Sequence, residues 1–421
     1  MKKILFLAAI VVLCTCTKTN GTFSNALGEA TNNSMTIPLS MALQSLDEML
    51  EDIRVVTKSS VNKEYSSSSV ISLGAGMIRE TKTDILGWDL PDTLMYLVNF
   101  DHDEGFAVLA GDRRLGESVY CLTESGEIGA NDFFVALDYL AGNSVETKAD
   151  SNEDGFYDIG MAFVPAFILS SMIIDLADGV DNIETKTIPV VTYNQALLNT
   201  KWGQYEPFNT YTPADGNVPH CPTGCTPTAC AQIMAYCEKP VYPDFDGVPC
   251  SWSTIKTVCT YLDPYGLTAS GVAKEQVAKF LFHLGKSHLC NVSYSATGSG
   301  AYAAGAQRTL NYYGYSNVKR YLGFGSTNQS RASTMLSNNK PVLLSGFDSH
   351  NGGGHTWVID GEYNGYYHCN WGWYGAWDGY FAKHNWFKLS YRNSLDSKDS
   401  GGTNSLNKDY DWNFRLVTYS L

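Results

Sequence analysis

A cysteine, a histidine and an asparagine follow one another in the second half of the chain, each in a setting that suits a chemical role. Cys225 begins a predicted helix, His355 follows three glycines into a predicted strand, and Asn370 lies in the next strand. A thiol nucleophile needs a base to take its proton, and the base needs a group that orients it. The order of the three residues therefore predicts acyl transfer through a cysteine thiolate.

The nucleophile is expected at the start of a buried helix. Pro227 suits the first helical turn. The buried stripe that follows has helical spacing and consists of Cys230, Ile233, Met234 and Cys237. Unpaired N–H groups and the helix dipole favour a thiolate, so we expect the pKa of Cys225 to be lowered. The alternative is a buried, inert cysteine, although Thr223-Gly224 permits the close approach of a ligand.

His355 is the stronger candidate for the base. Gly352-Gly353-Gly354 leaves room for a substrate backbone beside it. A strand follows at once, in which the histidine shares one face with Trp357 and Ile359. His220 lies closer to the nucleophile in sequence, but on the loop before the helix, and is the weaker candidate.

The register of the hairpin decides whether Asn370 can reach the base. A two-residue turn at Asn364-Gly365 would leave Asn370 too far from His355 for a hydrogen bond. A four-residue loop over residues 361–364 instead places the two opposite each other, and the mechanism favours this register. Asn370 would then hold the imidazole tautomer, while Trp371 shields that contact from water. The alternative is an ordinary aromatic-rich hairpin with Asn370 on a solvated edge.

The N-terminus has the pattern of an export signal, predicted over residues 1–16. Lys2-Lys3 precedes an apolar run from Ile4 to Leu13, and small or polar residues follow. Leu13-Cys14-Thr15-Cys16 also resembles a bacterial lipobox, in which an acylated Cys16 would tether the chain to a membrane; otherwise both cysteines are merely signal residues. No later apolar stretch is long enough to span a bilayer. We expect an extracellular, periplasmic or outer-membrane-attached bacterial protein.

Length and charge predict two domains in the remainder, because about 400 residues exceed one ordinary core. Residues 16–186 carry 28 Asp and Glu against 10 Lys and Arg, whereas residues 187–421 carry 15 against 17. The acidic segment could be a detachable partner that docks by charge complementarity, or simply a solvated acidic domain. Neither part is basic enough to predict nucleic-acid binding.

Residues 17–186 are predicted to form a small α+β unit. Two β-rich runs, 94–100 and 105–110, flank a polar turn and predict a hairpin. A helix is predicted from apolar residues at helical spacing, namely Leu39, Leu43, Leu46, Leu50 and Ile53. The apolar segment 161–176 is expected to pack on the fold. Two copies of Glu-Thr-Lys, ending at Lys148 and Lys186, predict exposed cleavage points unless the repetition is a coincidence.

These motifs make the chain resemble the streptopain family of papain-like cysteine peptidases, over nearly everything after the signal. The resemblance is carried by Thr223-Gly224-Cys225 with Ala231-Gln232-Ile233-Met234, by Gly354-His355-Thr356-Trp357-Val358-Ile359-Asp360-Gly361 and by Asn370-Trp371-Gly372-Trp373. It implies an α+β fold: a papain-like peptidase domain over residues 187–421, with a helical part and an antiparallel sheet part, preceded by a small α+β prodomain.

The resemblance also implies roles for further residues. Gln204 in Trp202-Gly203-Gln204 matches a family motif whose glutamine helps form the oxyanion hole, together with the backbone N–H of the nucleophile. Ser299 and Gly354 lie in loops that border the substrate cleft in the family, and are candidate backbone contacts to a peptide unless they are mere connectors. Phe106 to Arg114 resembles the inhibitory propeptide, so residues 17–186 would cover the cleft until cleavage near Lys148 or Lys186.

The chain departs from the family pattern in its additional cysteines. Seven of them accompany the nucleophile in the second half: Cys221, Cys230, Cys237, Cys250, Cys259, Cys290 and Cys369. Export permits disulfides, but an odd number cannot all pair internally, and we expect mostly reduced core thiols. A zinc site at His220, Cys221 and Cys225 is the metal alternative; its spacing is not a standard one and it would remove the nucleophile.

The predicted function is that of a secreted cysteine endopeptidase, made as a zymogen, which hydrolyses peptide bonds through an acyl-enzyme. It needs no cofactor. Its expected partners are protein or peptide substrates and its own propeptide, acting as an intramolecular inhibitor. The alternative is a catalytically silent papain-like protein that binds peptides or host surfaces, which the intact Cys225, His355 and Asn370 make less favoured.

Overall fold

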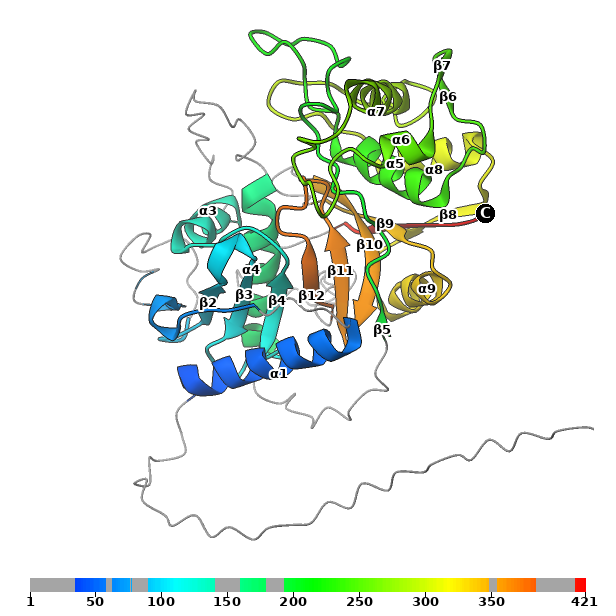
Figure 1. Cartoon of the computed structure of the whole chain (residues 1–421). Helices are drawn as coiled ribbons and strands as arrows, with labels where there is room; N and C mark the ends of the chain where they lie inside the picture. The colour runs from blue at the N-terminus through cyan, green and yellow to red at the C-terminus, as the bar shows by residue number, and fades with distance from the viewer. Residues whose placement is uncertain are drawn as a thin grey trace, which may run out of the picture. The chain divides into compact units, whose positions relative to one another are not determined.

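The computed structural model describes residues 35–57, 63–75, 77, 90–140, 160–178, 193–347, 354–383 and 413–421 (Figure 1). It combines helices with antiparallel strands, which confirms the α+β class. None of the helices in these ranges is long and apolar enough to cross a membrane. The predicted signal at 1–16, the two lysines Lys148 and Lys186, and the predicted boundary between 186 and 187 lie outside the described residues.

The first half contains the predicted hairpin and helix. Its elements are α1 (Leu39–Thr57), η1 (Ser67–Ser69), β1 (Ile71–Leu73), β2 (Met95–Asn99), η2 (Asp101–Asp103), β3 (Phe106–Ala110), β4 (Val119–Thr123), α3 (Ala130–Leu140) and α4 (Gly160–Asp178). Strands β2 and β3 pair with Met95 opposite Ala110, so the hairpin is confirmed. The α1 helix buries Leu46 completely. The side chains of α4 from 163 to 175 are buried, as expected of the apolar segment.

The second half begins with a short strand and a group of helices, and ends in strands. Its elements are β5 (Tyr193–Asn194), α5 (Cys225–Cys237), β6 (Asp244–Phe245), β7 (Val248–Pro249), α6 (Trp252–Ile255), α7 (Gly271–Leu284), α8 (Ala303–Tyr312), β8 (Ser316–Leu322), α9 (Ser326–Ser337), β9 (Val342–Phe347), β10 (Gly354–Tyr363), β11 (Tyr366–Asn370), β12 (Gly379–Ala382) and β13 (Arg415–Ser420). Both the helix predicted at Cys225 and the strand predicted at His355 are present.

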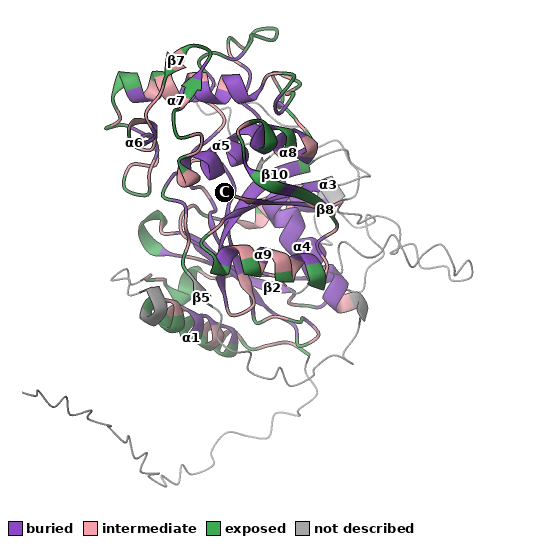
Figure 2. Ribbon diagram, turned by 90° about the vertical axis from the view of Figure 1, so that its right-hand side faces the viewer, coloured by how far each residue is buried: buried purple, intermediate pink, exposed green. Residues whose placement is uncertain are grey.

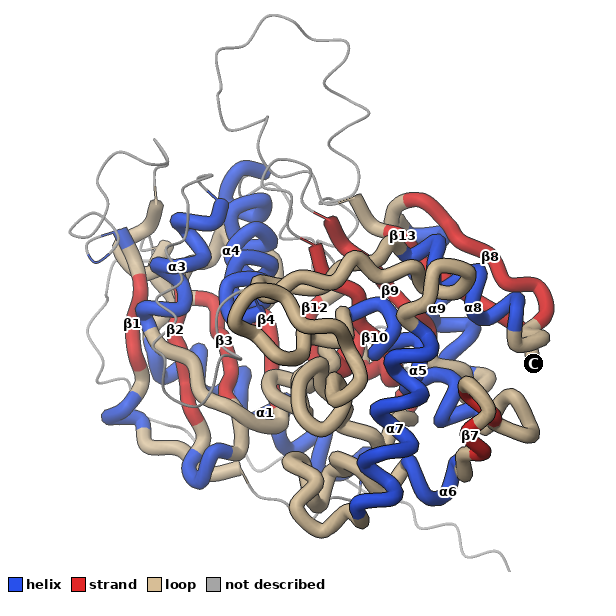
Figure 3. The backbone as a smooth tube through the Cα atoms, turned by 90° about the horizontal axis from the view of Figure 1, so that it is seen from above, coloured by secondary structure: helices blue, strands red, loops and turns tan. Residues whose placement is uncertain are grey.

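One antiparallel sheet runs through both halves. Its strand order is β1-β2-β3-β4-β12-β11-β10-β9-β13-β8, and β5 pairs with β10 outside this path. Figure 3 shows these strands as a row. The two halves join where β4 pairs with β12, with Cys121 opposite Phe381. The first half is therefore bonded edge to edge to the part of the sheet that carries the predicted site.

Helices cover both faces of this sheet. On one face lie α3, α4 and α9, in a core that includes Trp357 and Ile359 of β10. The other face is covered by α1 over the first half, and by α5 and α8 over the second half, in a core that includes Val358 and to which α7 is added by its packing on α5. Figure 2 shows α4 buried along most of its length. The alternation of side chains along β10 is as predicted, and it assigns successive residues to different helical layers.

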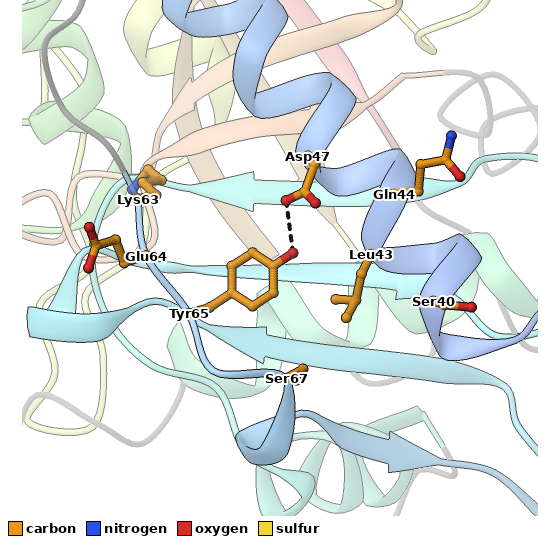
Figure 4. A pocket seen from close by; sticks show the side chains of 8 residues that line it. All are labelled: Ser40, Leu43, Gln44, Asp47, Lys63, Glu64, Tyr65 and Ser67. Carbon is orange, nitrogen blue, oxygen red and sulfur yellow. Dashed lines mark hydrogen bonds between the residues drawn. The ribbon is translucent and has the colours of Figure 1, made fainter.

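A hollow on the first half lies between α1 and the segment that follows it (Figure 4). The hydroxyl of Tyr65 donates a hydrogen bond to Asp47 Oδ1 across it, at 2.8 Å. The residues that line it are Ser40, Leu43, Gln44, Asp47, Lys63, Glu64, Tyr65 and Ser67. None of the predicted site residues borders this hollow.

The register predicted for the β10–β11 hairpin is wrong. Asn364 and Gly365 form a two-residue turn, and a bulge between Ile359 and Gly361 brings Asn370 opposite Val358. Both turn residues have positive φ, 39° at Asn364 and 96° at Gly365. An Asn-Gly pair adopts such angles readily in tight hairpins, so the local turn chemistry sets the register.

Candidate active site

Cys225 is the first residue of α5, at the end of a loop that only glycine can form. Gly224 precedes it with φ 93°, a conformation that L side chains rarely adopt. A Cβ at Gly224 would lie 3.1 Å from the carbonyl oxygen of Ser299. The structure thus places Ser299, a predicted substrate contact, directly beside the nucleophile loop.

The first turn of α5 is bonded to the strand that carries His355. Thr226 Oγ1 donates to the carbonyl oxygen of Ala301 at 2.7 Å and lies 3.0 Å from Thr356 Oγ1. Thr356 directly follows His355 in β10. The structure therefore brings the candidate nucleophile and the candidate base to neighbouring positions, although they are 130 residues apart in sequence.

The Cys225 thiol is not activated in this state. Its pKa is raised, because desolvation by burial outweighs hydrogen bonds with Thr356 and Thr226 that favour the thiolate. The prediction of a lowered pKa is wrong here, since the benefit of the helix N-terminus does not compensate for the loss of water. At neutral pH the group is a thiol.

The imidazole of His355 is buried and engaged elsewhere. Its Nε2 lies 2.7 Å from the carbonyl oxygen of Trp371, an acceptor, so Nε2 carries the proton. Its ring lies 4.5 Å from that of Trp373 and 5.3 Å from that of Phe163 in α4, between centroids. Burial lowers the pKa of His355 to about 4, although the Trp371 carbonyl favours the charged form. The imidazole is therefore neutral at neutral pH.

The two candidate partners lie on different faces of the sheet. His355 shares the α4 face with Trp357, whereas Thr356 points to α5. Cys225 and His355 both belong to the described residues, and no hydrogen bond joins them there. The side chains that could form the catalytic pair are near one another in the fold but not in contact.

Asn370 occupies neither of the positions that the sequence suggested. It is buried, with 1% of its surface exposed, so it is not on a solvated edge. Its Nδ2 donates to the carbonyl oxygen of Thr200 at 3.0 Å, and its Oδ1 accepts from Gln232 Nε2 at 2.8 Å. The predicted contact with His355 is absent among the described residues, because the two-residue turn at Asn364-Gly365 leaves Asn370 opposite Val358, three residues from His355.

The backbone of Gln204 lies next to the loop that leads to Cys225. Its carbonyl oxygen accepts a hydrogen bond from Thr223 N at 2.8 Å, two residues before Cys225. The preceding Gly203 has no room for a side chain, because a Cβ would lie 2.1 Å from the Tyr374 ring. The motif therefore requires glycine at 203, and it places the Gln204 backbone beside the loop that leads to Cys225.

Trp371 is buried in the same layer as His355. Its Nε1 donates to the carbonyl oxygen of Trp377 at 3.0 Å, and its backbone N donates to Asp378 Oδ1 at 2.8 Å. Its ring lies 5.0 Å from that of Trp357. The backbone carbonyl oxygen of Trp371 thus accepts the hydrogen bond from His355 Nε2.

Known proteins resemble the chain over the segments that contain these residues. The family model of the Peptidase C10 family matches residues 202–381, which include the segments of Gln204, Cys225, His355 and Asn370. Streptopain of Streptococcus pyogenes serotype M1 is 27% identical over 348 residues, covering 75% of this chain and 80% of streptopain. The chain matches the Peptidase C10 family over residues 202–381 and is similar to streptopain. It is a cysteine-type peptidase, which confirms the resemblance to streptopain.

Two further proteins are similar to this peptidase. The thiol protease/hemagglutinin PrtT of Porphyromonas gingivalis is 30% identical over 196 residues, covering 43% of this chain and 22% of PrtT. Among solved structures, a fragment of prointerpain A from Prevotella intermedia aligns with a TM-score of 0.48 and 21% identity, over 77% of this chain and 94% of the fragment.

The peptidase also contains a buried charged network that sequence reasoning missed. Lys201 Nζ lies 2.9 Å from Asp378 Oδ2 and 3.1 Å from Glu124 Oε2. On the other side of Glu124, His368 Nε2 lies 3.2 Å from Oε1, and its Nδ1 lies 2.6 Å from Asp360 Oδ1. These five residues come from separate segments, so no spacing along the chain predicts them.

The network favours the charged forms of His368 and Glu124. Burial alone lowers the pKa of His368, but the carboxylates of Asp360 and Glu124 raise it to about 10. Burial alone raises the pKa of Glu124, but Lys201 and His368 hold it well below its usual range. Glu124 follows β4 in the first half and is thus inserted between two cations of the second half.

The remaining predicted residues are placed as follows. Gly354 is exposed, pairs with Phe347 and adjoins His355. His220 Nδ1 lies 3.2 Å from the carbonyl oxygen of Thr212. The nine cysteines in the described ranges are free thiols. The same ranges contain no cluster of three His, Cys, Asp or Glu side chains that could hold a metal ion.

Proposed function

We propose that this peptidase is an exported zymogen that cleaves proteins at internal peptide bonds, with Cys225 as the nucleophile and His355 as the base. The observation that carries the proposal is the bonding of the first turn of α5 to β10, through Thr226 and Thr356 at 3.0 Å. It brings the thiol to the residue adjacent to His355. The loop before Cys225 packs closely against Ser299 at Gly224.

The reaction follows from these positions. His355 leaves the Trp371 carbonyl and accepts the proton of Cys225 Sγ, giving a thiolate and an imidazolium. The thiolate attacks the peptide carbonyl, whose oxyanion is stabilised by the backbone N–H of Cys225 and the side-chain amide of Gln204. His355 then protonates the leaving amine, and water attacks the acyl-enzyme to release the second product. Ser299 and Gly354 border the cleft and would contact the substrate backbone.

The first half serves as the propeptide in this proposal, because it keeps His355 away from the thiol. Phe163 packs on His355 at 5.3 Å and on Trp357 at 5.8 Å, between ring centroids. The α4 helix that carries Phe163 covers the face of the sheet on which His355 lies. Removal of residues 17–186, by cleavage near Lys148 or Lys186, would free the imidazole to turn toward Cys225.

The hairpin residues have supporting roles. Trp371 holds His355 through its carbonyl in the covered state, and its ring shields the imidazole from water. Asn370 fixes the backbone next to Trp371, since its Oδ1 also accepts from Gly372 N at 3.2 Å. Export rests on the predicted signal at 1–16, and acylation of Cys16 would add a membrane tether.

Labelling and processing assays test the proposal. The full-length chain and its Cys225→Ala variant are activated, sequenced from the N-terminus, and assayed with a protein substrate and a covalent thiol-directed inhibitor. We expect label at Cys225 in the wild type only after processing, and a loss of turnover of at least about 10³-fold in Cys225→Ala.

The matched control is Cys221→Ala, which removes a buried thiol from the same loop and should leave turnover unchanged. Turnover by Cys225→Ala would overturn the assignment of the nucleophile. A processed wild type that is neither labelled nor active would instead favour a silent, peptide-binding protein.

A further inference from the structure

A closed ring of hydrogen bonds joins three segments of the peptidase beneath Cys225. Gln232 Nε2 donates to Asn370 Oδ1 at 2.8 Å, and Asn370 Nδ2 donates to the carbonyl oxygen of Thr200 at 3.0 Å. Thr200 Oγ1 donates back to Gln232 Oε1 at 2.9 Å. All three side chains are buried, and Gln232 is fully so. Each amide has one orientation that satisfies the ring, so its geometry is specified.

Gln232 lies on the same face of α5 as Cys225. The two are seven residues apart, which is close to two helical turns and about 10 Å along the axis. Between them on this face is Thr228, whose Cγ2 would lie 3.3 Å from a Cβ at Gly372. Asn370 contacts Gln232 and Gly372 contacts Thr228, so the segment with Trp371 runs along the helix that carries the nucleophile.

Gln232 also reaches the segment that leads to the oxyanion hole. Its Oε1 accepts from the backbone N of Trp202 at 3.3 Å, in addition to the Thr200 hydroxyl. Trp202 is two residues before Gln204. One side chain therefore bonds to the backbone next to the oxyanion residue, and to the hairpin whose next carbonyl accepts from His355.

We propose that Gln232 is a positioning residue of this peptidase, a role that rests on the active site proposed above. Its amide fixes the Trp371 segment and the Gln204 segment against the helix that begins at Cys225. An apolar side chain of the same length would fill the space but could not set these distances. Small misplacements of catalytic groups reduce the rate of chemistry far more than they reduce substrate binding.

The test compares full-length variants after activation by trypsin, which is then inhibited. Active sites are titrated with a covalent thiol reagent, and kcat and KM are measured on a peptide substrate. Gln232→Met should lower kcat per titrated site about 10- to 100-fold, with KM within about twofold. Thr200→Val removes one bond of the ring and should cause a smaller loss. The double variant should be no worse than Gln232→Met alone, because both act through the same ring.

Met234→Ala is the matched control, since Met234 is fully buried in the same helix but has no part in the ring. It should lose stability on urea unfolding and keep kcat per titrated site. Wild-type kcat in Gln232→Met, or an equal loss in Met234→Ala, would overturn the role of Gln232. If Gln232→Met does not fold, wild-type kcat in Thr200→Val overturns it. Turnover by Cys225→Ala in the same series would overturn the proposed site itself, so the two failures are distinguished.

Discussion

His355, the proposed base, is held by its surroundings in a neutral form turned toward the Trp371 carbonyl. Its Nε2 proton is donated to the Trp371 carbonyl, and aromatic rings replace the water that an imidazolium needs. Covering the residue therefore lowers the basicity that is needed to deprotonate the Cys225 thiol. Phe163 is the ring among its neighbours that comes from the proposed propeptide.

Phe163→Ala should weaken the covering of His355 without touching the peptidase domain. Removing a large buried ring costs about 3–5 kcal/mol of unfolding free energy. Part of this loss should destabilise the packing of α4 over His355. In the full-length variant, Cys225 should therefore be alkylated faster than in the full-length wild type. The rate of incorporation of a thiol reagent at Cys225 measures the effect.

Phe167→Ala provides the comparison, because Phe167 lies one turn further along α4 and packs on Trp357 and Phe414. It should destabilise the chain to a similar extent with a smaller gain in alkylation. Equal rates in the two variants would show that loss of packing, and not release of His355, exposes the thiol.

Individual residues also show where sequence patterns are sufficient. Cys225 and His355 were placed correctly at the starts of a helix and a strand, because glycine, proline and apolar spacing are local signals. The register of Asn370 was predicted wrongly, because the expected mechanism was preferred over the Asn364-Gly365 turn signal, and the bulge between Ile359 and Gly361 then shifts the pairing by one further residue. The raised pKa of Cys225 depends on burial, which only the folded chain determines.

At the scale of elements, strand pairing and the Glu124 carboxylate both join the two halves, in addition to the packing of α4 on the sheet. Strand β4 extends the sheet beyond β12, and Glu124 follows β4 directly. The carboxylate then meets Lys201 and His368 of the second half. Because main-chain pairing is largely independent of side chains, the charged contact is the part of this junction that point variants can test.

Glu124→Gln should weaken the binding of the propeptide. The amide keeps the shape of the carboxylate but leaves Lys201 and His368 with one negative partner fewer. Loss of a buried pair costs about 3–5 kcal/mol, but Glu124 is 32% exposed, so we expect about 1–3 kcal/mol. In a Cys225→Ala background, cleaved between the halves by trypsin, the dissociation constant of the propeptide should rise about 5- to 100-fold.

Glu127→Gln is the control, since Glu127 is an exposed carboxylate three residues further along the chain. It removes the same charge from the propeptide and should leave the dissociation constant unchanged. An equal effect of both variants would mean that the overall charge of the acidic half, and not the contact with Lys201 and His368, holds the propeptide in place.

The whole molecule could be predicted only in outline. Composition and charge predicted an acidic first half and a near-neutral second half, and the local patterns predicted the helices and hairpin of each. The continuous sheet was not predicted, because the pairing of Cys121 with Phe381 joins segments that are about 260 residues apart. Such long-range pairing leaves no signal in a single sequence.

The covered state is the one in which α4 of the first half packs over His355. Its stability should decrease in acid because His355 takes up a proton. Covering lowers the pKa of this residue from its ordinary value of 6.5 to about 4, so the covered state favours the neutral imidazole. Its stabilisation is complete above pH 6.5, is lost as the pH falls through this window, and has disappeared by about pH 4. Through His355, the free energy of unfolding of the covered state should therefore fall by about 3 kcal/mol between pH 6.5 and about pH 4.

Urea unfolding of the full-length Cys225→Ala chain between pH 7 and pH 4.5 tests this linkage without self-cleavage. A second variant that also carries His355→Gln keeps a donor for the Trp371 carbonyl but has no titrating group. The chain with His355 should lose about 2–3 kcal/mol more than the His355→Gln chain over this range. Groups such as Glu124 and His368 titrate equally in both variants, so their contributions cancel in the comparison. If the two unfolding free energies fall in parallel, His355 does not couple acid to uncovering, and the site would have to be opened by proteolysis alone.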